Sequence, residues 1–201
     1  MIPMKKEDVT KWPTLISCGI LKNEIKEILS KNDWPIQTRF LDSSLHINLD
    51  RLSHVLSKAL SKDDTKKLVL YGTCHPKMDD ILAGADAKKI PGQNCVEFLL
   101  GKERFTKELS KGAFFLFEDW AVRWEKISYE YFGNWEIMRE IFQSCHKYIL
   151  CIKTPCSGDY EESANKVSQC TGLPLVWEDF GLEQLEKVFV SNLHKATWEW
   201  G

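Results

Sequence analysis

The sequence predicts an α/β protein in which βα units form one or more mostly parallel sheets with helices on both faces. Short apolar runs, typical of buried strands, alternate along the 201 residues with longer segments whose apolar residues recur at helical spacing. This β-α-β-α-β order with short connections is the pattern of a parallel sheet with crossover helices. The chain is long enough for one domain or for two small lobes around a cleft.

The first half of the chain gives the clearest alternation. The run at residues 14–17 ends at Cys18, and the segment after it carries Ile25, Ile28 and Leu29 on one helical face. A second helical stripe includes Leu52 and Leu56. We therefore expect strands at residues 14–17, 35–41, 68–71 and 87–90, and helices at residues 20–30, 49–60 and 96–109.

The second half continues the pattern with more aromatic residues. Gly133 and Asn134 separate two aromatic-rich helical stretches, which predicts an αα hairpin. We expect strands at residues 148–153 and 174–177, and helices at residues 120–132, 135–145, 160–169 and 182–190. Residues 113–117 are either a strand or a buried segment. Residues 1–12 are interpreted as an N-terminal arm and residues 13–201 as a single α/β domain. If the chain forms two lobes, we expect them at about 13–112 and 113–201.

The charge and hydropathy of the chain exclude some classes of partner. A formal net charge of −2 gives no electrostatic reason to expect nucleic-acid binding. No apolar run reaches the length of a membrane span, and the first residues lack the apolar core of a signal peptide. We therefore expect a cytoplasmic protein that binds neither nucleic acid nor membrane. A homo-oligomer is compatible with the sequence.

Three of the seven cysteines occupy positions typical of a functional site. Cys18 and Cys74 follow predicted strands, and Cys95 precedes a predicted helix. Because parallel strands end at the same edge of a sheet, these thiols are expected to face one crevice. Thiolates are soft ligands that suit zinc or iron–sulfur clusters. The pattern favours a metal site on Cys18, Cys74 and Cys95, with small buried cysteines as the alternative.

Other residues near these cysteines could assist such a site. His75 could be a fourth ligand, a donor to a ligand or a general acid, and Glu97 lies in a first helical turn, where an acid is favoured in any case. Cys156 also follows a strand and could complete a set of four. His46, His54 and His194 have no spacing that suggests a site. The aromatic residues of the second half are expected to be core rather than a cofactor platform; they are Trp120, Trp124, Tyr131, Phe132 and Trp135.

Common catalytic motifs are missing from the sequence. It contains no GxGxxG after a strand, no GxxxxGK[ST], no GxSxG and no HExxH. Thiol redox catalysis is disfavoured as well, because no CxxC pair occurs. The sequence therefore assigns no catalytic residue.

Three segments combine the cysteines with neighbouring glycines: Cys18-Gly19-Ile20, Tyr71-Gly72-x-Cys74 and Ile90-Pro91-Gly92-x-x-Cys95-x-Glu97-Phe98-x-x-Gly101. In order and spacing, this set resembles a family called domain of unknown function 1638. The resemblance continues through Gly112-Ala113-Phe114-Phe115-Leu116 and covers about residues 14–188. The chain departs from the family pattern at His75, where a glycine is common, and at Asn94, where a histidine is common.

The resemblance implies a setting for the predicted site. The family occurs in anaerobic archaea and bacteria, often alongside corrinoid-dependent methyltransferases. By resemblance, Cys18, Cys74 and Cys95 are its cysteine set. From their places beside these cysteines, His75 and Glu97 are candidate cofactor-binding residues. We expect an iron–sulfur cluster of the 4Fe–4S type, or zinc, in anaerobic corrinoid, methyl-transfer or one-carbon metabolism, with a corrinoid protein or methyltransferase as partner. A non-catalytic accessory or scaffold protein is the alternative.

Overall fold

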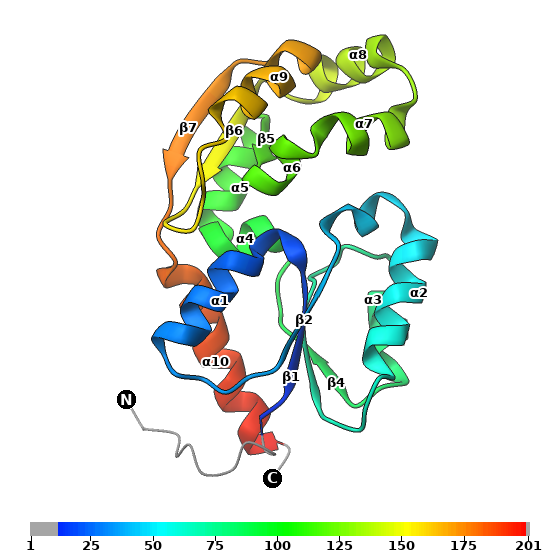
Figure 1. The fold of residues 1–201 in the computed structure, drawn as a ribbon, viewed down its shortest axis with the longest axis vertical. Coiled ribbons are helices and arrows are strands. Elements are labelled where there is room, and N and C mark those ends of the chain that lie inside the picture. The colour runs from blue at the N-terminus through cyan, green and yellow to red at the C-terminus, as the bar shows by residue number, and fades with distance from the viewer. Residues whose placement is uncertain (1–11, 200–201) are drawn as a thin grey trace.

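Two parallel sheets, surrounded by helices, make up the protein (Figure 1). The computed structural model describes residues 12–199, and side chains within residues 12–193. The expected N-terminal arm at residues 1–12 lies, apart from Trp12, outside the described residues. Both sheets contain only parallel pairs, so the prediction of an α/β fold of parallel βα units is confirmed. No helix in the described part of the chain is long and apolar enough to cross a membrane.

The first sheet has the strand order β2-β1-β3-β4. The central strands β1 (Thr14–Cys18) and β3 (Lys67–Leu70) are buried throughout, as strands covered on both faces are. The outer strands are β2 (Thr38–Leu41) and β4 (Ala87–Lys89). The chain starts in the middle of the sheet and moves outwards in both directions, so the order reverses beside β1.

Helices cover both faces of this sheet, and alternate residues of each strand pack on opposite sides. Leu15 and Leu68 belong to the core shared with α1 (Lys22–Lys31) and α10 (Glu183–Glu199). Ile16 and Val69 belong to the core under α2 (Leu49–Leu60) and α3 (Met78–Ala83). This period of two is the one expected of pleated strands.

The second sheet has the order β5-β6-β7. Its strands are β5 (Ala113–Leu116), β6 (Tyr148–Lys153) and β7 (Leu175–Asp179). Ile149 and Cys151 face a core formed with α8 (Trp135–Cys145) and α9 (Glu161–Thr171). Leu150 and Ile152 face the opposite way, into the core shared with the first sheet.

Several expected elements differ in detail from the structure. The helix expected at residues 96–109 is two helices, α4 (Cys95–Leu100) and α5 (Lys102–Ser110), because Gly101 between them adopts φ +79°. The helix expected at residues 120–132 begins earlier and is divided into α6 (Glu118–Val122) and α7 (Trp124–Phe132). Helix α3 was not predicted, since its six residues are too few to show a helical stripe.

The last helix joins the two sheets into one body. In Figure 1, β7 leads down from the second sheet to α10, which runs beside α1 and β1 of the first sheet. Leu185, Phe189 and Leu193 of α10 are fully or almost fully buried, and they lie in one core with Leu15 of β1 and Leu150 of β6. The first sheet and its helices are called the first lobe below, and the segment from β5 to β7 the second lobe.

Candidate functional site

The three cysteines predicted to act together do lie together, at the end of the first sheet. Cys18 is the last residue of β1, Cys74 lies in the loop after β3, and Cys95 is the first residue of α4. All three side chains line one cavity between the lobes. None of the seven cysteines forms a disulfide, so these three are free thiols. Parallel strands thus bring residues from distant parts of the chain to one edge.

The two loops that carry Cys74 and Cys95 are packed directly on each other. Thr73 donates both its backbone N–H (2.8 Å) and its hydroxyl (3.1 Å) to the carbonyl oxygen of Gln93. Gly72 adopts φ +59°, and a Cβ atom there would lie 2.4 Å from the same oxygen. Only glycine allows this approach. The glycine two residues before Cys74 is therefore what holds that cysteine beside Cys95.

Two of the three thiols, Cys74 and Cys95, have shifted pKa values, and the neighbouring thiols are the leading cause. A hydrogen bond from Cys95 lowers the pKa of Cys74 and outweighs the opposite effect of burial. Hydrogen bonds with Cys18 and Cys74, together with burial, raise the pKa of Cys95 well above its ordinary value. Cys74 is therefore the sulfur at which negative charge is favoured, and Cys95 is the proton donor that stabilises it.

A buried tyrosine hydroxyl stands next to this group. Tyr71 follows β3 directly and is only 2% exposed, and its hydroxyl has no hydrogen-bond partner among the described residues. Burial, followed by the proximity of Cys18, Cys95 and Cys74, raises the pKa of Tyr71, so the phenol stays protonated. A buried donor without an acceptor is costly in a folded protein. Its position indicates an acceptor at the cysteine site.

The cavity in front of the thiols has a volume of about 370 Å³ and is lined by both lobes. The first lobe contributes the cysteines, Ile20, His46 and Tyr71, and the second lobe contributes mostly aromatic side chains. β5 is the edge strand of its sheet and runs along the cavity, followed by Phe117 and Trp120. The site is therefore a largely apolar chamber with sulfur on one wall.

Contacts between the lobes close one side of this chamber. The His46 imidazole stacks on the Trp120 indole, with ring centroids 4.7 Å apart and planes 2° apart. Beside it, the Arg123 guanidinium donates to both oxygens of Asp42, at 2.9 and 3.1 Å. Burial acts against ionisation of Asp42, but hydrogen bonds from Ser44 and Arg123 prevail and lower its pKa to about 2. The pair is ionised at neutral pH.

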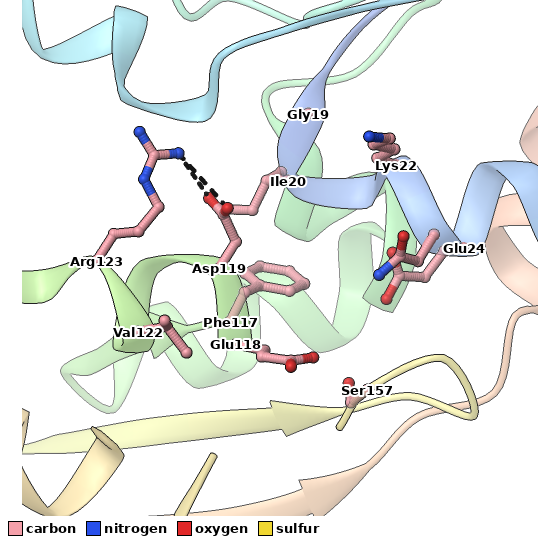
Figure 2. A pocket seen from close by; sticks show the side chains of 11 residues that line it. Gly19, Ile20, Lys22, Glu24, Phe117, Glu118, Asp119, Val122, Arg123 and Ser157 are labelled. Carbon is pink, nitrogen blue, oxygen red and sulfur yellow. Dashed lines mark hydrogen bonds and ion pairs between the residues drawn. The ribbon is translucent and has the colours of Figure 1, made fainter. Parts of the chain in front are cut away.

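A second pocket of about 290 Å³ adjoins the first, and Ile20 and Phe117 line both. It is polar, and Figure 2 shows the Arg123–Asp119 ion pair on one side and Glu24 on the other. Glu24 accepts a hydrogen bond from the Thr154 hydroxyl of the second lobe at 2.8 Å. Burial is the main cause that raises the pKa of Glu24.

Three other candidates from the sequence, His75, Glu97 and Cys156, lie outside the cysteine cavity, whereas Asn94 lines it. His75 is 8% exposed, and its Nδ1 accepts the backbone N–H of Lys77 at 3.0 Å. Glu97 accepts the backbone N–H of Gln93 at 3.3 Å, while Asn94 caps α4 by accepting from the Glu97 N–H. Cys156 lies in a different pocket beside Pro155. His75 and Glu97 thus hold the backbone of the two cysteine loops.

Within residues 12–193, no group of three or more His, Cys, Asp or Glu side chains is placed so that it could hold a metal ion. Each cysteine turns about a single side-chain torsion, so side-chain rotation alone redirects its sulfur. The chemistry of the three thiol donors fits a soft metal.

Sequence reasoning missed the residues that surround the sulfur atoms. His46 showed no spacing typical of a site, Trp120 was expected to be core, and His146 was not considered, yet all three line the cavity. Tyr71 ends a predicted strand and belongs to the motif Tyr71-Gly72-x-Cys74, but sequence reasoning assigned it no role in the site. Its position directly before Gly72-x-Cys74, at the carboxyl end of a buried strand, is the one signal that could have indicated a role.

Comparison with known proteins identifies a family and no closer relative. The family model described as a protein of unknown function (DUF1638) matches residues 40–189, which is most of the chain. The match includes Cys74 and Cys95 and begins after Cys18. No curated protein and no solved structure matches the chain.

Proposed function

We propose that this chain, which belongs to the DUF1638 family of proteins of unknown function, holds an iron–sulfur cluster on Cys18, Cys74 and Cys95. The observation that supports this most directly is the meeting of three free thiols from distant segments at one wall of a cavity. Three thiolates suit a 4Fe–4S cluster and leave one iron open to a ligand or an electron acceptor. When bound, such a cluster supplies one-electron chemistry or a Lewis-acidic iron.

Tyr71 gives this proposal a second support. Its protonated hydroxyl is buried, has no partner among the described side chains and lies near all three cysteines. Hydrogen bonds to ligand sulfur tune the potential of a cluster, and Tyr71 is placed to donate one. His75 and Glu97 would then act as positioning residues, because each accepts a backbone N–H of a cysteine loop.

The cellular role that we propose follows from the family resemblance. The chain would act in the cytoplasm of an anaerobe, in corrinoid-dependent methyl transfer or one-carbon metabolism. Its partner would be a corrinoid protein or a methyltransferase, to which the cluster passes electrons.

The test is metal analysis of protein prepared without oxygen. After reconstitution with iron and sulfide, we expect bound iron, acid-labile sulfide and visible sulfur-to-iron charge-transfer absorption. Cys18→Ser, Cys74→Ser and Cys95→Ser should each lose most of the iron. Cys145→Ser is the matched control, since Cys145 is an exposed free thiol away from the cavity.

Two results would replace the cluster by one of its competitors. Zinc without iron, lost in the same three variants, would indicate a zinc–thiolate site with an open position for a thiol substrate. If neither the parent protein nor any variant binds iron or zinc, the three cysteines are structural thiols of an accessory protein.

A further inference from the structure

Aromatic side chains form most of the cavity wall beside the three cysteines. They belong to α5, to β5 and to the chain after β5, and they are Phe105, Phe114, Phe115, Phe117 and Trp120. Phe114, Phe115 and Trp120 are only half-buried, so these rings offer surface to a bound molecule. Small-molecule sites are largely apolar cavities of about 300–1,000 Å³, and the volume of about 370 Å³ falls within that range.

The wall of this cavity carries no positive charge. Among the described residues that line it there is no Lys or Arg, and also no Asp or Glu. Burial lowers the pKa of both His46 and His146, so their imidazoles are neutral at physiological pH. The sulfur side is neutral as thiols and negative as thiolates, and three thiolates outweigh the double positive charge of a zinc ion. An anion therefore gains no counter-ion in any of these forms, whereas a cation gains one whenever a sulfur atom is ionised.

Charged side chains beside the His46–Trp120 stack act in the same direction. The carboxylates of Asp42 and Asp119 share the single guanidinium of Arg123, so this group of three has a net negative charge. Asp42 is near enough to Tyr71, which lines the cavity, to raise the pKa of its phenol. The electrostatic surroundings of the cavity therefore favour a cation as well.

The aromatic rings add a preference for one kind of cation. The face of an aromatic ring carries negative partial charge and attracts a cation that lies over it, most strongly when the ring is an indole. The side-chain oxygen of Asn94, which lines the cavity, already accepts the backbone N–H of Glu97 at 3.0 Å. A primary ammonium would leave water for a wall with few side-chain acceptors for its N–H groups, which is costly. A quaternary nitrogen has no N–H group and avoids this cost.

We propose that the cavity binds an organic cation with a quaternary nitrogen, whose carbon groups are alkyl or aromatic. These carbon groups would lie against the aromatic wall, and the three cysteines would be next to the bound cation. The inference rests on the lining of the cavity and goes beyond the proposed iron–sulfur cluster, which it does not require.

Three probes of similar shape and different charge test the proposal on the full-length protein. They are choline, its uncharged carbon isostere neohexyl alcohol, and the anion of tert-butylacetic acid. By calorimetric titration, we expect choline to bind about tenfold more tightly than the alcohol, as cation–π contacts imply, and the anion to bind most weakly. The N-methyl proton resonance of bound choline should move upfield, because an aromatic ring shields protons that lie over its face. N-methylquinolinium, a flat cation, should displace choline, and the tighter binder of the two shows whether the carbon groups are alkyl or aromatic.

Variants locate the site and separate it from the metal proposal. Phe115→Leu and Trp120→Leu keep an apolar side chain without the ring, so each should lower the affinity for choline severalfold. Their affinity for neohexyl alcohol should change little, which shows that the cavity is intact. Trp135→Leu, at an indole that is 42% exposed outside the cavity, is the control.

The order of the three probes should be the same in metal-loaded and metal-free protein, because the aromatic wall is common to both. No preference for choline over the alcohol in either form, tighter binding of the anion, or unchanged choline affinity in both ring variants would overturn the inference. Iron analysis of the same samples decides separately whether the cluster is present.

Discussion

The Glu24 side chain connects the two lobes, and the free energy of burying its carboxyl group depends on pH. It is 6% exposed, lies on α1 and accepts the hydroxyl of Thr154, which follows β6. Burial is the main cause of its raised pKa, and the nearby Glu118 carboxylate acts in the same direction. The fold therefore favours the protonated carboxyl, which can still accept the Thr154 hydrogen bond.

This shift predicts a pH-dependent effect of Glu24→Gln. Because the folded pKa is raised, the stabilising contribution is complete below the unfolded pKa and is lost as the pH rises through the folded one. Glutamine mimics the protonated acid and does not titrate. We therefore expect the variant and the parent to be equally stable at pH 4 and the variant to be more stable at pH 8, by urea unfolding. Glu27→Gln, at an exposed position of the same helix, is the control. A difference that stays constant with pH would contradict the assignment.

At the scale of single residues, the sequence predicted the three cysteines of the cavity but not the side chains that line it beside them. Cys18, Cys74 and Cys95 were predictable because strand ends collect at one edge of a parallel sheet. His46 and Trp120 could not be recognised, because their stacking depends on how two separately formed lobes meet. An aromatic residue at helical spacing looks the same whether it faces a core or a cavity.

Among the elements, the two cysteine loops depend on one backbone conformation. Gly72→Ala would place a Cβ 2.4 Å from the carbonyl oxygen of Gln93 and strain a residue at φ +59°. We expect a loss of more than about 1 kcal/mol in unfolding free energy, together with weaker metal retention, as the loops separate. Denaturant unfolding measures the first effect and metal analysis the second.

Gly84→Ala is the matched control for this change. Gly84 ends α3 with φ −89°, and an added Cβ would meet nothing within 4 Å. Its effect on stability should stay within about 0.5 kcal/mol. Equal stability of the two variants would mean that the Gly72 loop tolerates a side chain and does not fix Cys74.

The sequence predicted the ends of a helix correctly where its hydrophobic pattern was strong. The prediction was wrong where a single residue interrupts a helix. Helix α2 spans residues 49–60 as expected, because its apolar stripe and its Asn48 cap agree. The break at Gly101 was invisible, since apolar residues continue on both sides and the conformation of one glycine ends the helix. These differences leave the order of strands and helices unchanged, apart from the added α3.

For the molecule as a whole, α10 is the element on which the union of the lobes depends. Phe189 is fully buried in the core that both sheets share. Phe189→Ala should cost about 3–5 kcal/mol of unfolding free energy. Both lobes should still unfold in one transition at lower denaturant concentration, since each contributes to the same core. Val190→Ala, at a position 37% exposed on the same helix, should cost far less. Separate transitions of the two lobes in the parent protein would show that the core does not couple them.

The return of α10 to the first sheet also sets the order in which the protein can be completed during synthesis. Every strand of both sheets leaves the ribosome before residues 183–199 do. Until then Leu15 and Leu68 lack the cover that Leu185, Phe189 and Leu193 provide. The half of the protein that is translated first is therefore finished last, and the nascent chain exposes apolar surface to chaperones in the meantime.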